Sequence, residues 1–125
     1  MLRWPRWTSV RTSSAPVRGL RVGGVRRGEL WRAPSVVRDR TILIVSAQPV
    51  IDRGVSMLYG VEADEQDPGA ILLVVPVEVD GELRWLNVQR GLTRVYRPTL
   101  TESLGLVDQA VLDQLDALLR VALDL

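Results

Sequence analysis

The pattern of hydrophobic residues divides the chain into a β-rich body and a helical end. Between residues 26 and 97 the apolar runs are short, rich in β-branched residues, and separated by glycine, proline or acidic residues. This pattern is typical of strands joined by tight turns. The predicted strands lie at residues 28–33, 41–46, 55–63, 70–79, 82–89 and 93–97. We therefore expect a mainly β domain of five to six short strands.

Local features refine three of these strands. The run "TILIVS" at residues 41–46 is continuously apolar up to its final serine and too short for a helix, which predicts a central strand buried on both faces. Pro76 indicates that the second half of its strand lies at an edge or a bulge, because proline cannot donate a ladder hydrogen bond. The dipeptide Asp80-Gly81 stands between two apolar runs and predicts a tight hairpin.

After Pro98 the hydrophobic period changes to that of a helix. One face of the predicted helix carries Val111, Leu115, Leu118 and Ala122. Asp108 comes just before this pattern and is the expected N-cap, since its carboxylate can accept from the first free N–H groups. Because a single helix is marginal alone, its apolar stripe must cover an open side of the sheet or barrel.

The N-terminal segment, residues 1–25, has no apolar period. It mixes arginine with serine, glycine and proline and cannot bury enough surface to offset the entropy of ordering. We expect a disordered basic extension over residues 1–25, followed by one domain over residues 26–125. Trp4 and Trp7 could stack on a nucleic acid, although an unstructured tail is the simpler interpretation.

The composition excludes several kinds of chemistry. The 125-residue chain has no cysteine and no histidine, and all sixteen of its basic residues are arginine. Disulfides, thiolate metal sites and a histidine general base are therefore excluded, and we expect neither a metal nor another cofactor. No apolar run approaches the roughly 18 residues of a membrane span, and no secretory signal is evident. We expect a cytoplasmic protein without membrane contact.

Charge is distributed unevenly along the chain. Residues 1–40 carry ten arginines and two acidic residues, whereas residues 41–125 carry six arginines and thirteen acidic residues. The net charge is only +1. Such asymmetry suggests a basic tail or face on an acidic body.

Three short motifs follow one another along the chain. The first is "RGELW" at residues 27–31, an arginine, a glycine, an acid, an apolar residue and an aromatic residue in succession. The second strand opens with Arg40 and runs through apolar residues into Ser46. The chain closes with "ALDL" at residues 122–125. Taken in this order, the motifs resemble the MazF/PemK family of toxins from toxin–antitoxin systems, and the resemblance covers about residues 26–125.

This resemblance implies a fold, an activity and partners. The fold would be a small SH3-like β-barrel with an amphipathic C-terminal helix, usually a homodimer. Typical members cleave single-stranded RNA without a metal, and a cognate antitoxin protein blocks their site. DNA would be contacted only indirectly, through a toxin–antitoxin complex. In such members the arginine that opens the second strand and a threonine that ends the third carry the chemistry, and Arg40 matches the arginine.

The sequence departs from the family pattern at three positions. Thr41 replaces the usual proline, and Ala47 stands where many members have asparagine. The catalytic threonine is replaced by Glu62 if residues 55–63 are the third strand. If the run that contains Pro76 is aligned instead, Glu78 takes the place of the threonine. We prefer Glu62, because that alignment leaves enough strands before the helix.

Arg40 and Glu62 form a chemically workable pair. Metal-free RNA cleavage needs a base for the 2′-hydroxyl and a cation for the charge that develops on the phosphorane. Without histidine and lysine, the base must be a carboxylate and the cation an arginine. Two other interpretations remain open: Arg40 pairs with Asp39 or Glu29 at the end of a strand, or Glu62 belongs to a solvated acidic loop.

The last predicted strands carry several arginines that suit a polyanion. Arg84, Arg90 and Arg94 are the candidate nucleic-acid-binding residues, because they could follow an RNA backbone. The acidic tail of an antitoxin, or simple solvation of a sheet edge, would explain them equally well. The sequence thus indicates an endoribonuclease toxin. The alternative is a catalytically degenerate member that acts as a nucleic-acid- or antitoxin-binding module.

Overall fold

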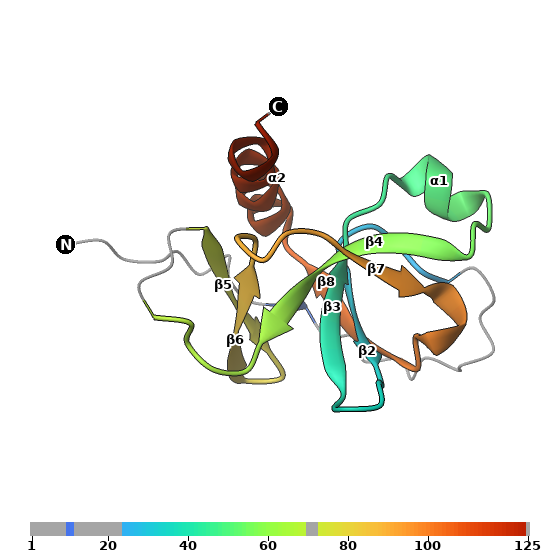
Figure 1. Cartoon of the computed structure of the whole chain (residues 1–125), viewed down its shortest axis with the longest axis horizontal. Helices are drawn as coiled ribbons and strands as arrows, with labels where there is room; N and C mark the ends of the chain where they lie inside the picture. Colours follow the sequence, from blue (N-terminus) through green and yellow to red (C-terminus); the bar gives the residue numbers. More distant parts are fainter. Residues whose placement is uncertain (1–9, 12–23, 70–72, 125) are drawn as a thin grey trace.

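The computed structural model describes residues 10–11, 24–69 and 73–124 as an antiparallel β structure with one long helix (Figure 1). The elements are β1 Val10–Arg11, β2 Glu29–Ala33, β3 Arg40–Ile44, α1 Gln48–Asp52, β4 Met57–Asp64, β5 Val74–Val79, β6 Glu82–Asn87, β7 Thr93–Tyr96, a 3₁₀ turn at Arg97–Thr99, β8 Glu102–Val107 and α2 Gln109–Leu123. The predicted mainly β class with a C-terminal helix is confirmed.

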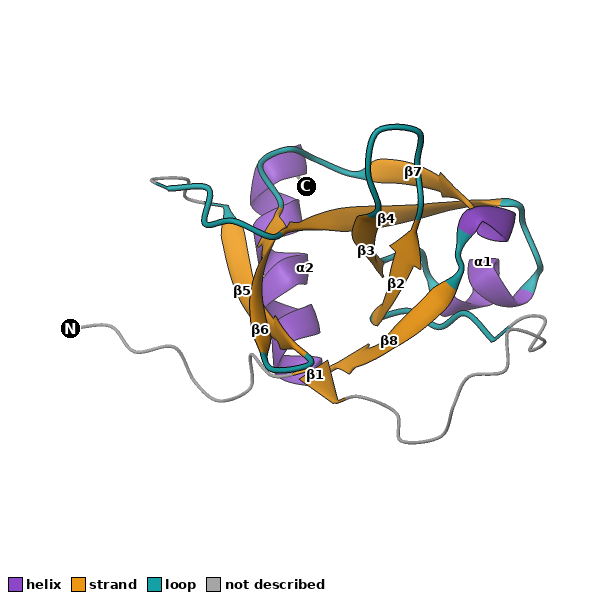
Figure 2. Cartoon of the chain, turned by 90° about the horizontal axis from the view of Figure 1, so that it is seen from below, coloured by secondary structure: helices purple, strands orange, loops and turns teal. Residues whose placement is uncertain are grey.

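The strands form one strongly curled sheet. Their order is β1-β8-β2-β3-β4-β6-β5, and β7 pairs with β4 beside this path. Seen from below, the strands curve around in a barrel-like arrangement, and α2 lies beside β5 and β6 (Figure 2). The helix therefore covers the open side of the barrel, as its apolar stripe requires.

Strand β4 is the junction of the sheet. Its first half pairs with β7, from Met57 to Gly60, and its middle pairs with β3 up to Glu62. From Ala63 it leaves β3 and pairs with β6. The end of β4 is thus the place where two parts of the sheet separate, and Glu62 lies at that point.

Two hydrophobic clusters fill the two faces of the central strands. The first cluster includes Leu43 of β3 and the α2 residues Val111 and Leu115. The second contains Ile42 and Ile44 of β3 and is covered by Ile51 of α1 among others. Strand β3 is therefore buried on both faces, as its continuous apolar run predicts.

The predicted turn and helix start are also present. β5 and β6 are antiparallel, and Val79 pairs with Glu82 across the two-residue turn. Asp80 and Gly81 both have positive φ, +53° and +80°, which is the conformation of a type I′ hairpin. Asp108 is the N-cap residue of α2, and its carbonyl oxygen accepts from the backbone N–H groups of Val111 and Leu112. Its carboxylate makes no capping hydrogen bond to the helix, so that part of the prediction is wrong.

Three elements were not expected from the sequence. β8 at Glu102–Val107 directly precedes the helix, so its apolar residues merge with the helical pattern. α1 has only five residues, too few for a periodic signal. β1 lies within the segment expected to be disordered and pairs with β8.

Residues 1–9, 12–23 and 70–72 lie outside the described part of the chain, so the expectations for them stay predictions. No helix in the described part is long and apolar enough to cross a membrane.

Candidate active site and nucleic-acid interface

Arg40 opens β3, where it pairs with Ala33 of β2. Its side chain is partly buried, and its Nε atom is buried without a hydrogen-bond partner among the described residues. An unpaired buried donor is unusual in a folded protein and calls for an explanation. One explanation is an acceptor that arrives with a ligand.

The two carboxylates expected as alternative partners of Arg40 are engaged elsewhere. Glu29 accepts hydrogen bonds from the hydroxyl of Ser103 and the backbone N–H of Arg26. Asp39 lies 3.8 Å from Arg32. In the described part of the chain, Arg40 is therefore not the strand-end ion pair that the sequence left open.

Glu62 is buried in the sheet and does not lie in a solvated loop. It pairs with Ile42 of β3, and only 8% of its surface is exposed. Residues directly opposite each other in an antiparallel pair share a face, and diagonal neighbours on that face have Cβ atoms somewhat less than about 7–8 Å apart. Arg40 is two residues before Ile42, so it is the diagonal neighbour of Glu62 on the same face. No hydrogen bond or ion pair joins the two side chains among the described residues.

Two other arginines compensate the buried charge of Glu62. The Nη2 atom of Arg38 lies 2.9 Å from Oε2, and the Nη1 atom of Arg90 lies 3.3 Å from Oε1. A buried carboxylate is tolerated only with such partners. Neither contact is an aligned hydrogen bond, and Oε2 is a buried atom without a hydrogen-bond partner among the described residues.

Arg90 is held firmly by its own neighbours. Its Nη1 and Nη2 atoms donate to the two oxygens of Asp64, at 2.9 Å and 3.2 Å. Asn87 donates to the Oδ2 atom of Asp64 at 3.1 Å and accepts from the backbone N–H of Arg90. We call Arg38, Glu62, Arg90 and Asp64 the ion-pair network. It joins the loop before β3, the end of β4 and the turn after β6.

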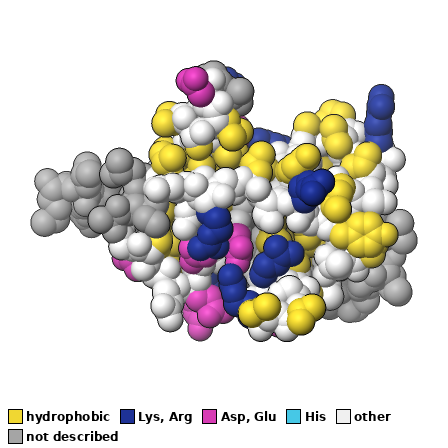
Figure 3. Space-filling view, in the orientation of Figure 1, with side chains coloured by type: hydrophobic (Ala, Val, Ile, Leu, Met, Phe, Trp, Pro, Cys, Tyr) yellow, Lys and Arg dark blue, Asp and Glu magenta, His cyan; other side chains and the backbone are white. Residues whose placement is uncertain are grey.

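A cavity of about 680 Å³ lies beside the ion-pair network. Its lining residues are Arg38, Asp39, Asp64, Glu65, Gln66, Asp67, Pro68, Asn87 and Arg90. Figure 3 shows basic and acidic side chains gathered side by side on one face of the molecule. The lining includes two basic and four acidic residues. A polyanion would therefore be attracted only at the points where the arginine side chains are accessible to it.

The structure brings together only part of the predicted site. Arg90 contacts Glu62. Arg84 lies opposite the buried Val77 on the neighbouring strand, and Arg94 lies opposite Tyr59. By strand alternation, both lie on the opposite face from Glu62. Arg84 is paired with the neighbouring Glu82 at 2.9 Å.

Glu78, the alternative to Glu62, lies on a strand that does not pair with β3, the strand that carries Arg40. It is exposed on β5, which pairs only with β6 among the described strands. Of the two alignments considered, the geometry favours the one that uses Glu62.

Sequence reasoning missed three residues of the site: Arg38, Asp64 and Asn87. Strand alternation could have placed Asp64 on the same face as Glu62, since they are two residues apart. Nothing in the local pattern singles out Arg38, which lies in an exposed loop, or Asn87, which ends β6.

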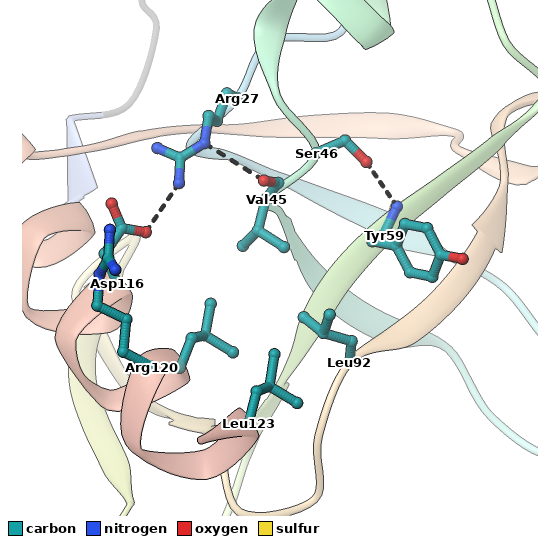
Figure 4. Close-up of a pocket in the computed structure, with 9 residues that line it drawn as sticks. Arg27, Val45, Ser46, Tyr59, Leu92, Asp116, Arg120 and Leu123 are labelled. Atoms are coloured by element: carbon teal, nitrogen blue, oxygen red, sulfur yellow. Dashed lines mark hydrogen bonds and ion pairs between the residues drawn. The ribbon is translucent and has the colours of Figure 1, made fainter. Parts of the chain in front are cut away.

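Two residues of the motifs that carry the resemblance have structural roles here. Arg27 donates to the carboxylate of Asp116 at 2.8 Å and to the carbonyl of Val45 at 3.3 Å, and so ties α2 to the barrel (Figure 4). The Ser46 hydroxyl oxygen accepts from the backbone N–H of Tyr59 at 2.8 Å. These residues line a second, mainly apolar cavity of about 390 Å³ between α2 and β4.

The described residues offer no metal site. No group of three or more acidic side chains in that part of the chain is placed to hold an ion.

Comparisons with known proteins identify the fold. No family model matches the sequence, and no curated protein matches it. The computed structure is similar to an endoribonuclease in complex with its cognate antitoxin from Mycobacterial species, with a TM-score of 0.71 and 20% identity over 82% of this chain and 97% of that chain. The Mycobacterium tuberculosis toxin MazF-mt6 matches with a TM-score of 0.66 and 15% identity, covering 78% of this chain and 97% of the toxin.

A third similar structure is a MazE-MazF complex from Deinococcus radiodurans, with a TM-score of 0.65 and 14% identity over 79% of this chain and 94% of that chain. The chain therefore has the fold of MazF-type toxins, as the resemblance in its sequence implied. At these identities the likeness establishes the fold.

Proposed function

We propose that the protein is the toxin of a type II toxin–antitoxin system and cleaves single-stranded RNA without a metal. One observation carries the proposal: Arg40, whose Nε has no hydrogen-bond partner among the described residues, and the buried carboxylate of Glu62 share one face of β3 and β4. The solved structures with the same fold include endoribonucleases and a complex with a cognate antitoxin. These similarities support a cytoplasmic toxin with such a partner.

The two residues have complementary roles in the proposed reaction. Glu62 accepts the proton of the 2′-hydroxyl, and the 2′-oxygen attacks the adjacent phosphorus. Arg40 stabilises the charge of the phosphorane, since guanidinium is a permanent planar donor that fits phosphate oxygens. The bond from phosphorus to the 5′-oxygen breaks, the leaving oxygen takes a proton from water, and a 2′,3′-cyclic phosphate remains.

The direct test is cleavage of a long single-stranded RNA by the purified protein in EDTA. We expect discrete fragments with cyclic phosphate ends, identified by mass spectrometry. Intact RNA after incubation with a well-folded protein would refute the enzymatic proposal.

Glu62→Gln should slow cleavage by about 10²–10⁴-fold, the usual contribution of a general base. Glutamine keeps the size of the side chain but cannot accept the proton, and RNA binding should persist because a negative charge near the phosphates is removed. Single-turnover rates and RNA affinity are the measurements. Glu78→Gln, which changes an exposed glutamate on β5, is the matched control and should retain the wild-type rate. Unchanged cleavage by Glu62→Gln would remove this residue from the chemistry.

The alternative function, a binding module without catalysis, is favoured by the charge around the site. The cavity lining carries more acidic than basic residues, and both oxygens of Glu62 already lie beside arginines. A protein of this kind would bind an antitoxin or nucleic acid but leave RNA intact. Contact with DNA would then arise only through the complex with the antitoxin.

We propose that the protein is a homodimer that pairs through an apolar surface on β4, β7 and the end of α2. This outer apolar surface consists of Met57, Tyr59, Leu92, Tyr96 and Leu123, each 39–50% exposed. In Figure 4 the side chains of Tyr59, Leu92 and Leu123 surround the apolar cavity. Contiguous apolar patches of this kind usually mark interaction sites. The five residues carry no charge, and Arg94, the cross-strand neighbour of Tyr59 on the same face, would lie at the edge of the interface, where its charge stays in water.

Tyr59→Glu combined with Tyr96→Glu should convert the dimer to a monomer. The two added carboxylates in each copy would lie in an apolar, desolvated interface at considerable cost. Light scattering after size exclusion measures the mass directly. Val36→Glu, which adds a carboxylate to another exposed hydrophobic position, should leave the dimer intact. A double variant that remains dimeric would exclude this surface as the interface.

A further inference from the structure

We propose that Arg38 is a phosphate ligand that masks Glu62 until RNA binds. In the ligand-free protein Arg38 covers the Oε2 atom of Glu62; when a phosphodiester enters, Arg38 exchanges this carboxylate for a phosphate oxygen. The inference rests on the proposed function, because it assigns the same site a further RNA contact and a device that exposes the base only with substrate.

The two arginines on Glu62 are held very differently. Arg90 makes two hydrogen bonds to Asp64 in addition to its contact with Glu62, so it is fixed by three contacts to two carboxylates. Arg38 has one side-chain contact among the described residues, the 2.9 Å approach to Oε2. That contact is not an aligned hydrogen bond, because Oε2 is without a hydrogen-bond partner among the described residues. The contact of Arg90 with Oε1 is likewise an ion pair only, so what holds Arg90 in place is its pair of hydrogen bonds to Asp64. The side chain of Arg38 is also 60% exposed.

The backbone around Arg38 allows the side chain to move without loss of the loop. Residues 34–39 are all exposed. A small turn holds this loop, since the N–H of Ser35 donates to the carbonyl of Arg38 at 3.1 Å. The Ser35 hydroxyl donates to the same carbonyl and accepts from the N–H of Arg38 at 3.3 Å. Arg38 can therefore swing by rotation about its side-chain bonds, which is rapid in exposed residues.

A phosphodiester offers Arg38 a better partner than Glu62 does. Guanidinium and phosphate form short, often bidentate hydrogen bonds, which are the strong class of charge-assisted contacts. A phosphate placed against Arg40 is close to Arg38, since the two arginines are two residues apart where the loop enters β3. Once Arg38 turns to the phosphate, Oε2 is free to accept the 2′-hydroxyl proton, while Arg90 continues to position Oε1.

Two measurements on Arg38→Gln test the inference, with Arg53→Gln, an exposed arginine after α1, as the matched control. The first is carbodiimide-driven amidation of Glu62 with glycine ethyl ester in the RNA-free protein, quantified by mass spectrometry. We expect several-fold more labelling in Arg38→Gln than in the wild type or the control. The second is the salt dependence of binding to a single-stranded RNA made non-cleavable by 2′-O-methyl groups. The slope of log affinity against log salt should be smaller by about 0.7, the loss of one phosphate contact on a single strand.

Each outcome is informative. Equal labelling of Glu62 in Arg38→Gln and wild type would show that Arg38 does not mask the carboxylate. An unchanged salt slope, or a wild type with no affinity for the oligonucleotide, would show that Arg38 is not a phosphate ligand. A wild type that binds the oligonucleotide but leaves natural RNA intact would defeat the endoribonuclease proposal alone, because both measurements on Arg38 are independent of cleavage.

Discussion

Replacing Arg40 with alanine should reduce RNA cleavage by about 10²–10³-fold, the typical cost of removing one preorganised donor from a site where charge develops. The buried Nε of Arg40 has no hydrogen-bond partner in the described part of the chain, and no ion pair with another described residue is lost when the side chain is removed. Single-turnover cleavage of a labelled single-stranded RNA in EDTA measures the effect. The melting temperature should remain close to that of the wild type.

Two controls separate charge from geometry. Arg40→Lys keeps the positive charge but lacks the planar fork of donors, so it should recover only a small part of the activity. Arg53→Ala removes an exposed arginine from outside the site and should leave the rate unchanged. If Arg40→Ala cleaves as fast as the wild type with its fold intact, Arg40 has no role in the reaction and the site must be sought elsewhere.

The parts of the fold that the sequence predicted are those with an uninterrupted local signal. The run at residues 41–46 predicts a strand buried on both faces, and Ile42 and Leu43 lie in different hydrophobic clusters. Asp80-Gly81 predicts the β5–β6 hairpin turn from two adjacent residues alone. β8 escaped prediction for the converse reason: Leu104 and Val107 are followed at once by the apolar face of α2. The two-residue period of the strand then runs directly into the helical period of α2, and no glycine or proline separates the two patterns.

The site was less accessible from the sequence than the fold. The resemblance to the MazF/PemK family pointed to Arg40 and Glu62, but the pairing that buries Glu62 depends on residues distant in the chain. Arg38 lies 24 positions before Glu62, and Arg90 lies 28 positions after it. No periodicity connects a loop, a strand end and a hairpin turn, so the ion-pair network is a property of the tertiary structure. The same holds for the expected arginines Arg84 and Arg94, which strand alternation turns to the other face.

The junction in β4 explains how a carboxylate can be buried at this point. β4 leaves β3 after Glu62 and joins β6 from Ala63, so the two parts of the sheet diverge beside the carboxylate. Arg38 and Arg90 contact the carboxylate at this point. The position of Glu62 relative to Arg40 is therefore set by the register of β3 and β4.

Gly60→Ala should test that dependence, with the largest effect on stability that we predict. Gly60 pairs with Ile44 at the end of the β3–β4 ladder. A Cβ atom added there would lie 2.8 Å from the carbonyl oxygen of Leu43 and would also overlap the side chain of the buried Ile42. The carbonyl belongs to the backbone of a paired strand, so relief requires β3 and β4 to separate or shift. Overpacking of this kind costs about 3 kcal/mol, which should lower the melting temperature by at least about 10 °C.

The shift would also move Glu62 away from Arg40, so the folded fraction of Gly60→Ala should cleave RNA more slowly than the wild type at a temperature where both are folded. Gly54→Ala is the comparison. Its φ of +79° makes alanine strained, but nothing lies within 4 Å of the added atom. It should lose about 1 kcal/mol of stability from the backbone alone and retain full activity. Calorimetry and single-turnover rates distinguish the two variants. A Gly60→Ala protein as stable and as active as the wild type would mean that the β3–β4 register does not constrain the site.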